Sequence, residues 1–313
     1  MQKLKVIIPD RMNGERLDVA IAELLPNYSR SKITAKIKSG EALIDNKAFK
    51  PKDKASGNET VFFEINHKIN THWIAEDISL DIVFEDEDII VINKPFGVVT
   101  HPGAGNWSGT LANALLYHNK NLLKLDRAGI VHRLDKNTSG LMVISKNAKS
   151  QKYLVNQLQV HSVEREYSAI VYGHMISGGT VNEPIGRDSR DRIKQAVSNG
   201  GKEAITHYRV IDRYKSHTHV KAILETGRTH QIRVHLSHIG HPLVGDPVYG
   251  GRVRYPKKAT QDLKNALLQF ERQALHSKKL TLTHPRSGET MTWKIDLPDD
   301  MKSLLNILME FDS

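Results

Sequence analysis

A short polar turn between two apolar segments, Asp135–Gly140, constrains this chain more than any other feature of its sequence. It separates Gly129–Arg133 from Leu141–Lys146. Short apolar segments bounded by turn residues are typical of buried strands, and Asp, Asn, Ser and Gly favour turns. We therefore predict a strand on each side of the turn, with Asp135 directly after an apolar strand that carries Arg133.

The length and composition are those of a water-soluble protein of about two domains. The chain has 313 residues and no cysteine, which excludes disulfides, cysteine-ligated zinc and thiol chemistry and fits a reducing compartment. No apolar run approaches the roughly 20 residues that span a bilayer, and the N-terminus lacks the apolar core of a signal peptide. We expect a cytoplasmic, monomeric protein that does not bind membranes.

The charge of the chain is strongly basic. Lys and Arg number 45 against 35 Asp and Glu, which gives a formal net charge of +10. A surplus of this size favours a polyanionic partner, usually RNA or DNA, although it also serves simple solubility.

Two short amphipathic helices are predicted near the N-terminus. Leu17, Ala20 and Ile21 share one face of a helix over Arg16–Leu25, and Ile33 and Ile37 form the stripe of a second helix over Arg30–Lys38. We predict a strand, a turn at Asp45-Asn46 and a second strand within Ala42–Phe49, and a further strand at Thr60–Ile65.

Cations gather on this first module. Residues 27–57 hold eight Lys and Arg against three acids, and four of the cations lie on the second helix. Two short helices followed by a small sheet, with cations on the second helix, resemble the S4 RNA-binding domain. We predict an S4-like domain with its linker over residues 1–75 and a second domain over residues 76–313. The RNA contacts expected in the first are Arg30, Lys32, Lys36 and Lys38.

The second domain mixes helices and strands without a regular βαβ rhythm, so we predict an α+β fold on a mixed, mostly antiparallel sheet. Besides the two strands around Asp135, strands are predicted at Val163–Gly173, His207–Tyr214, Thr218–Glu225, Lys279–His284 and Thr290–Ile295. Helices are predicted at Thr110–His118, Ala148–Val160, Thr229–Ile239, Gln261–Arg272 and Asp299–Phe311.

Several familiar motifs fail on their spacing. The glycine loop His101–Gly109 fits neither a Walker motif nor a dinucleotide fingerprint. The segment Asp135–Lys146 begins like a calcium loop but ends in lysine where glutamate is required. The histidines around Gly240 lack an acidic or cysteine ligand, and no G-x-S-x-G elbow is present. We therefore predict no metal site.

Three residues distinguish Asp135 from an ordinary turn former. Arg133 lies two residues before it, and Arg228 stands where a strand meets a helix. Tyr167 falls on a strand whose alternate residues are apolar, so its ring is expected to face inward; those residues are Val163, Ala169 and Val171.

Three segments resemble the signature motifs of the RluA-type pseudouridine synthases: HRLDKNTSGL, EREYSAIVYG and ETGRTHQIRVHLSHIGHPLVGDPVYG. The resemblance extends over almost the whole chain. It implies that Asp135 is the catalytic nucleophile or base and that Arg228 pairs with it. It also implies that Tyr167 stacks on the uracil and assists proton removal at C5, and that Arg133 fills the space of a flipped base.

The implied chemistry suits these residue types. Isomerisation of uridine gains and loses no atom, so no cofactor or metal is required. A carboxylate can act at C1′, C2′ or C6, an adjacent arginine stabilises its charged form, and an aromatic ring supports an extruded base. Asn137 and Ser139 replace the Asp and Thr frequent in this family but keep the polar character of the turn.

The domain order is closest to the family member that modifies the helix 69 stem-loop of large-subunit (23S) ribosomal RNA. The partner implied is that RNA or the assembling 50S subunit. Two alternatives stay open from the sequence, a family member that acts on other ribosomal sites and a non-catalytic S4-type assembly factor.

Overall fold

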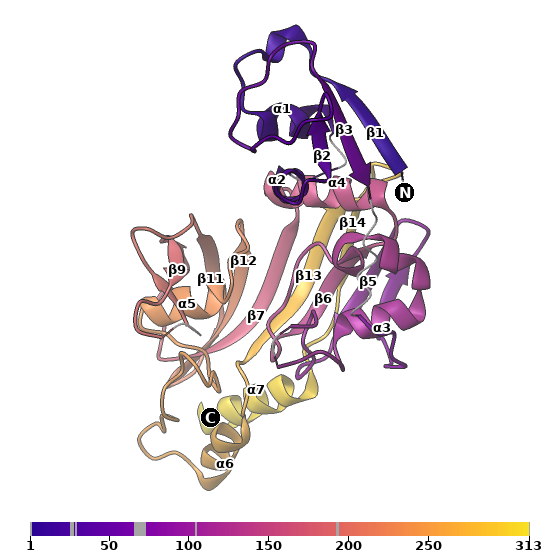
Figure 1. The fold of residues 1–313 in the computed structure, drawn as a ribbon. Coiled ribbons are helices and arrows are strands. Elements are labelled where there is room, and N and C mark those ends of the chain that lie inside the picture. Colours follow the sequence, from indigo (N-terminus) through magenta and orange to yellow (C-terminus); the bar gives the residue numbers. More distant parts are fainter. Residues whose placement is uncertain are drawn as a thin grey trace. The chain divides into compact units, whose positions relative to one another are not determined.

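The structure, a computed structural model, describes residues 2–25, 28, 30–65, 73–103, 105–191 and 194–312. The chain divides into two compact units, Met1–Thr71 and His72–Ser313 (Figure 1). Within the described ranges, no helix is both long and apolar enough to cross a membrane. The first part of the predicted linker, residues 66–72, lies outside these ranges.

The first unit is a three-stranded antiparallel sheet with two helices. Its elements are β1 (Gln2–Ile7), α1 (Leu17–Leu24), α2 (Arg30–Lys38), β2 (Ala42–Ile44) and β3 (Thr60–Ile65), with β3 in the middle of the sheet. Both predicted helices and their buried stripes are confirmed; Leu17, Ala20, Ile21, Ile33 and Ile37 all lie in one apolar core.

The sequence interpretation of this unit was wrong in two places. It missed β1, and it placed a second strand after the turn at Asp45-Asn46. Both turn residues have positive φ, and beyond them the chain makes only a single bridge from Lys47 back to Ile44. The tight turn therefore ends without a strand.

The second unit is built on a nine-stranded sheet, which confirms the predicted α+β class with a mostly antiparallel sheet. The strand order is β4-β5-β6-β13-β7-β12-β11-β8, with β14 also paired to β13. Only the β6–β13 pair is parallel among these ladders. The strands are β4 (Ile82–Glu85), β5 (Ile89–Lys94), β6 (Ser139–Ser145), β7 (Glu164–Tyr172), β8 (Gly179–Asn182), β11 (Ile205–Arg213), β12 (His217–Leu224), β13 (Leu275–Thr283) and β14 (Thr290–Lys294).

Helices cover both faces of this sheet. The helices are α3 (Leu111–His118), α4 (Ala148–Gln159), α5 (Gln231–His238), α6 (Gln261–Gln269) and α7 (Asp299–Asp312), and a separate two-stranded sheet joins β9 (Ile185–Arg187) to β10 (Gln195–Val197). Ile90 and Ile92 of β5 pack in a cluster with α3 and α5. Their neighbours Ile89 and Val91 pack with α4 on the other face, as the alternation of a strand requires.

The predicted strand at Gly129–Arg133 is wrong. Arg127, Ala128 and Gly129 have φ values of 52°, 52° and 77°, a left-handed run that no strand can contain. A Cβ on Gly129 would lie 2.0 Å from the carbonyl oxygen of Ser145, so only glycine permits this approach. The segment pairs with the backbone of β6 at one isolated bridge, Ile130 to Ile144, and then runs as a loop to Asp135. Side-chain hydrogen bonds also join Ser145 to Gly129 and Val143 to His132.

Strand β7 lies between β13 and β12, and it confirms the inward orientation of Tyr167. Tyr167, Ala169 and Val171 belong to the cluster that α3 and α5 cover. Val163, which the alternation had grouped with them, precedes β7 and packs with α4 instead.

Candidate functional site

The second unit contains a pocket of about 750 Å³, within the range of ligand sites. It lies between the Asp135 turn, the end of α4, β7 and the loop before α5. Apolar and ionisable residues share its wall. The ionisable ones are His101, Arg127, His132, Arg133, Asp135, His161, Arg165, Tyr167, Arg228, His230 and Arg233.

Two side chains from elsewhere in the unit, those of Thr100 and Lys94, hold the backbone around Asp135. The Thr100 hydroxyl donates to the carbonyl of Leu134 at 2.8 Å. Lys94 is fully buried and donates to the carbonyl of Lys136 at 3.2 Å, as well as to Pro95 O and Val98 O. Burial lowers the pKa of Lys94 to about 7, although the negative charge of Asp135 opposes the shift. The turn itself closes with a hydrogen bond from Thr138 N to Asp135 O at 3.1 Å.

Arg233 of α5 is the arginine that pairs with Asp135. Its Nη1 donates to Oδ2 of Asp135 at 2.9 Å. Its Nε and Nη2 donate to both oxygens of buried Asp246 at 2.7 and 2.9 Å, which fixes the plane of the guanidinium. Burial tends to lower the pKa of Arg233, but the carboxylates of Asp246 and Asp135 outweigh this effect and raise the pKa.

The expected pairing of Arg228 with Asp135 is therefore wrong. Arg228 lines the pocket, but its Nε donates to the carbonyl of Glu203 at 2.7 Å. The cause is local. His230 takes a left-handed conformation, so α5 begins at Gln231 rather than Thr229, and the Gln231 side chain accepts a hydrogen bond from the backbone N–H of Arg228 at 2.9 Å.

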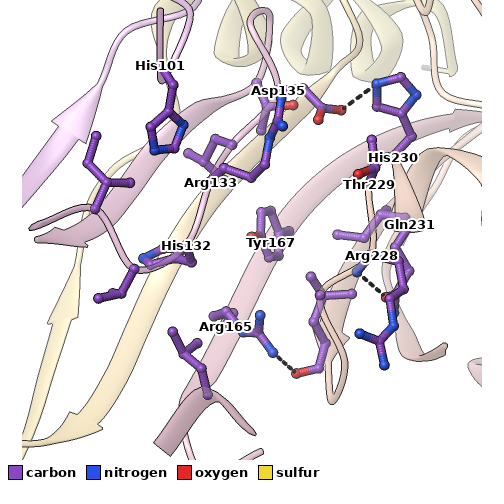
Figure 2. Close-up of a pocket in the computed structure, with 18 of the residues that line it drawn as sticks. His101, His132, Arg133, Asp135, Arg165, Tyr167, Arg228, Thr229, His230 and Gln231 are labelled. Atoms are coloured by element: carbon purple, nitrogen blue, oxygen red, sulfur yellow. Dashed lines mark hydrogen bonds and ion pairs between the residues drawn. The ribbon is translucent and has the colours of Figure 1, made fainter. Parts of the chain in front are cut away.

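His230 and Tyr249 support the Asp135–Arg233 pair. Nε2 of His230 lies 3.9 Å from Oδ2 of Asp135 (Figure 2). Nδ1 of His230 lies 2.9 Å from the hydroxyl of Tyr249. The Tyr249 ring also packs against the Arg233 guanidinium, 5.0 Å from its centroid. Burial lowers the pKa of His230 despite the opposing charge of Asp135, so the imidazole is neutral near pH 7.

Tyr167 lies in the same pocket as Asp135, as the sequence predicted, with 5% of its surface exposed. Five apolar side chains of its cluster also line the pocket: Ile130, Leu134, Leu224, Ile232 and Leu275. Burial raises the pKa of Tyr167, and the charge of Asp135 adds to the shift while that of Arg165 opposes it. The ring is a neutral phenol in an apolar wall, suited to contact with a planar base.

Arg133 also lines the pocket and is exposed, in a loop rather than in the predicted strand. His101 lies nearby in the loop before α3. Burial lowers the pKa of His101 to about 4, and the charges of Arg127 and Arg133 add to this effect. One end of the pocket thus carries positive charge beside a neutral imidazole.

The cations predicted on the first unit differ in their surroundings. Arg30 donates to buried Asp18 at 2.8 Å, and Lys36 to Glu41 at 2.7 Å. Lys38 is exposed. The side chain of Lys32 lies outside the described part of the structure.

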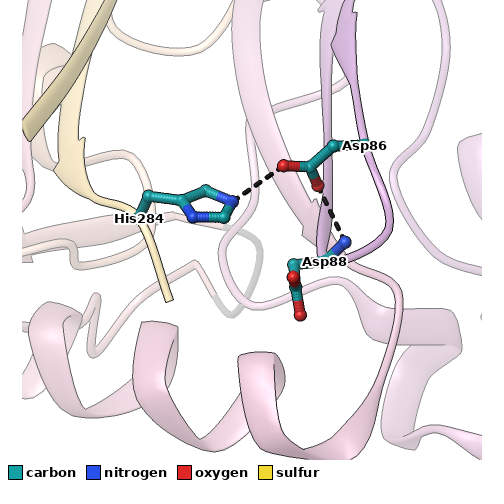
Figure 3. Close-up of side chains that lie close together, drawn as sticks. All are labelled: Asp86, Asp88 and His284. Atoms are coloured by element: carbon teal, nitrogen blue, oxygen red, sulfur yellow. Dashed lines mark hydrogen bonds and ion pairs between the residues drawn. The ribbon is translucent and has the colours of Figure 1, made fainter. Parts of the chain in front are cut away.

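A cluster of metal-ligating residues occurs elsewhere in the second unit, at Asp86, Asp88 and His284 (Figure 3). Nε2 of His284 lies 2.8 Å from a carboxylate oxygen of Asp86. Asp88 accepts a hydrogen bond from Ser150 at 2.7 Å and pairs with Arg286. His284 Nδ1 faces backbone N–H groups of the following turn. The two carboxylates already contact side chains of the protein, and the Arg286 guanidinium lies against Asp88. We therefore interpret the cluster as a structural network.

The sequence interpretation missed Arg233, Asp246 and Arg165. A signal was present for Arg233, because it stands between Ile232 and Val234 on a helix that packs into the core. A charged residue in such a position needs a buried partner. No pattern in the sequence says which acid supplies that partner.

Comparison with known proteins agrees with this geometry. The family model described as RNA pseudouridylate synthase matches residues 88–238. "Ribosomal large subunit pseudouridine synthase D" of Pseudomonas aeruginosa is 50% identical over 303 residues, which cover 97% of this chain and 95% of the relative. The protein of the same name from Escherichia coli K12 is 49% identical and covers 98% of this chain and 94% of the relative.

Solved structures agree as well. "Human RNA Pseudouridylate Synthase Domain Containing 1" matches with a TM-score of 0.57 and 25% identity, covering 74% of this chain and 89% of that chain. "Human RNA Pseudouridylate Synthase Domain Containing 4" gives a TM-score of 0.57 and 27% identity, covering 73% and 92%. The chain therefore belongs to the RNA pseudouridylate synthase family, as its RluA-type motifs indicated, and it is an isomerase that forms pseudouridine.

Proposed function

We propose that this enzyme isomerises uridines of large-subunit ribosomal RNA, with the helix 69 stem-loop as its target and Asp135 as the catalytic residue. The names of the relatives support the ribosomal substrate, since each matches over nearly its whole length. The proposed target within that RNA rests on the resemblance of the sequence motifs and domain order.

One observation carries the assignment of Asp135. Arg233 holds Oδ2 at 2.9 Å, while Oδ1 accepts no hydrogen bond from any residue in the described ranges. The side chain is 15% exposed, at a pocket large enough for a nucleotide. A carboxylate that is oriented through one oxygen and open at the other is suited to act on the ribose or the base.

The neighbouring residues support extrusion of the target base. A uridine stacked in RNA must leave its stack before a carboxylate can reach the glycosidic bond. Tyr167 offers a platform, and base–aromatic stacking contributes about 1–3 kcal/mol. Its raised pKa favours stacking over removal of the C5 proton, because a neutral phenol is a poor base. Exposed Arg133 is proposed to occupy the space that the base leaves.

We propose that residues 1–75 form an S4-like RNA-binding domain with its linker. Two helices on a small sheet and a cationic second helix support this interpretation. Lys38 is its best-supported RNA contact because it is exposed, whereas Arg30 and Lys36 already pair with acids. A monomer acting in the cytoplasm on RNA or on the assembling 50S subunit is the setting that we propose.

A pseudouridine map tests the function. Purified protein, without added metal or cofactor, is incubated with unmodified large-subunit RNA and with assembled subunits, and new sites are located by carbodiimide labelling and primer extension. Asp135→Asn is the test variant, and Asp299→Asn, on a carboxylate that is 98% exposed on α7, is its matched control.

New pseudouridines confined to helix 69, present with the control and absent with Asp135→Asn, would support target and catalytic residue together. Sites elsewhere would replace the target and keep the chemistry. Full activity of Asp135→Asn would refute the assignment of the catalytic residue.

A further inference from the structure

Among the described residues, Arg165 is a buried cation that has no anionic partner. Only 6% of its surface is exposed, and it lines the pocket from β7, two residues before Tyr167. Its Nη2 donates to Glu225 O at 2.9 Å and to Leu224 O at 3.5 Å. Its buried Nε has no hydrogen-bond partner in the part of the chain that the structure describes. Within the described residues it forms no ion pair.

The other buried arginines of this unit differ in this respect. Arg233 meets two carboxylates, and Arg272 makes a bidentate pair with Asp300 at 2.6 and 2.8 Å. A buried charge without a counterion is costly, and burial accordingly lowers the pKa of Arg165. A free N–H in a ligand pocket indicates that the ligand supplies the acceptor.

The position of Arg165 identifies the part of the substrate that reaches it. In Figure 2 the ring of Tyr167 lies between Asp135 and Arg165. Alternate residues of a strand share a face about 6.6–6.8 Å apart. A base on Tyr167, with its glycosidic bond at Asp135, would therefore direct its far edge toward Arg165. In uracil the acceptors on that edge are carbonyl oxygens.

We propose that Arg165 forms a second subsite, which binds a carbonyl oxygen of the uracil and stabilises the negative charge that the base acquires during the reaction. This inference rests on the proposed function. When the N1–C1′ bond breaks, its electron pair leaves with the base and spreads over N1, O2 and O4, while an oxygen of Asp135 bonds to C1′. C5 then bonds to C1′ as the bond from C1′ to Asp135 breaks and returns its electron pair to the carboxylate. C5 finally loses its proton and N1 gains one, so that uracil is restored.

Arg165 is suited to this charge because its donor is already in place and shielded from water. Preorganised donors of this kind typically contribute about 10²–10³ in rate. The neighbouring backbone also makes room for the guanidinium, since a Cβ on Gly227 would lie 2.7 Å from its Nη1.

The competing explanation is that Arg165 only holds the end of β12 through the carbonyls of Leu224 and Glu225. Exchange of single substrate atoms separates the two. Helix 69 stem-loops carrying uridine, 2-thiouridine or 4-thiouridine at one target position are converted under single-turnover conditions by wild type and by Arg165→Met. Sulfur accepts hydrogen bonds more weakly than oxygen. If Arg165 contacts the substituted atom directly, the loss of rate on replacing that oxygen with sulfur (the thio effect) should be present in wild type and largely absent from Arg165→Met.

We expect Arg165→Met to slow conversion of uridine by about 10²–10³ while RNA affinity is retained. One of the two thio substitutions should slow wild type and have little further effect on the variant. Gly227→Ala displaces the guanidinium without removing it, and it should reduce the same thio effect relative to wild type. Equal thio effects in wild type and Arg165→Met, at both positions, would overturn the subsite.

Failure of the proposed target would look different. If wild type left the uridine stem-loop unmodified, the helix 69 assignment would fall. The same substitution series would then be made at the uridine found by the pseudouridine map, because the subsite concerns the base rather than the RNA around it.

Discussion

Nη1 of Arg233 lies 2.9 Å from Oδ2 of Asp135, although 98 residues separate the two in the sequence. Asp246 fixes the same guanidinium from its other side. Burial raises the pKa of Asp246, but the hydrogen bonds and charge of Arg233 outweigh it and lower the pKa. The orientation of Asp135 therefore depends on a buried pair that does not itself react.

Replacement of Arg233 should affect the reaction far more than replacement of Arg228. Arg233→Gln removes the donor that orients Asp135, and we expect the single-turnover rate to fall by about 10²–10³. Arg228→Gln removes a bond to a backbone carbonyl and should keep most of the rate. The opposite order of effects would show that Arg228 orients the carboxylate during catalysis.

A stability measurement accompanies this comparison, because Arg233→Gln leaves Asp246 buried without its cation. Loss of one partner of a buried pair costs about 3–5 kcal/mol. The double variant Arg233→Gln, Asp246→Asn should regain part of the free energy of unfolding in urea but not the rate. If it regained both, the role of Arg233 would be structural.

Gly140 is expected to resist replacement. It ends the Asp135 turn with a φ of 113°, and a Cβ there would lie 2.3 Å from the carbonyl oxygen of Ser277, its partner on β13. Gly140→Ala should destabilise the protein by roughly 1–3 kcal/mol from steric overlap alone. Gly97→Ala, at a φ of 83° but in open space, is the control and should cost less. Chemical denaturation measures both, and similar losses would mean that β13 moves aside.

Acid should destabilise the second unit partly through His217. Burial lowers the pKa of this fully buried histidine to about 4 in the folded state, against 6.5 when solvated, although the charge of Asp312 opposes the shift. The unfolded chain then binds more protons between these values. The contribution of His217 is therefore complete above pH 6.5 and is lost as the pH falls toward 4.

Between pH 7 and 5 this loss amounts to about 2 kcal/mol. His217→Leu should be less stable at pH 8 because packing against Tyr172 changes, but its stability should decline less between pH 7 and 5. Urea unfolding at each pH gives both quantities. Parallel declines in wild type and variant would mean that His217 is not the titrating group.

Lys38 should contribute to RNA affinity through charge alone. Lys38→Gln should weaken RNA binding and reduce the magnitude of the slope of log affinity against log salt by about 0.7–0.9. Lys302→Gln, on α7 and paired with Asp299, is the matched control. Arg30→Gln should instead lower stability, because it removes a hydrogen-bonded cation from buried Asp18. An unchanged salt slope for Lys38→Gln would remove it from the RNA contacts.

The sequence predicted those parts of the fold that depend on local periodicity. The stripes of α1 and α2 are buried as expected, and Tyr167 faces the pocket because a strand alternates. The segment before Asp135 was predicted as a strand because its residues are apolar. The left-handed run at Arg127–Gly129 overrides that preference, and it is fixed by contact with Ser145 on another strand.

The sequence identified Asp135 as a residue of the candidate site, but it did not identify the arginine that pairs with Asp135. Asp135 stands in a recognisable motif, whereas the choice between Arg228 and Arg233 depends on where α5 begins. The left-handed conformation of His230 and the bonds of the Gln231 side chain decide that start. The Gln231 side chain bonds to β11, and the His230 side chain bonds to Tyr249. Such contacts leave no periodic trace in a sequence.

The position of β13 has a consequence for the order in which this enzyme is made. β13 lies between β6 and β7 in the sheet, yet it begins at Leu275, more than a hundred residues after either. A chain emerging from the ribosome holds Asp135 and Tyr167 long before the strand that joins their two halves of the sheet. We expect the pocket around Asp135 to form only after β13 has been synthesised, so a growing chain that still lacks β13 should not modify RNA.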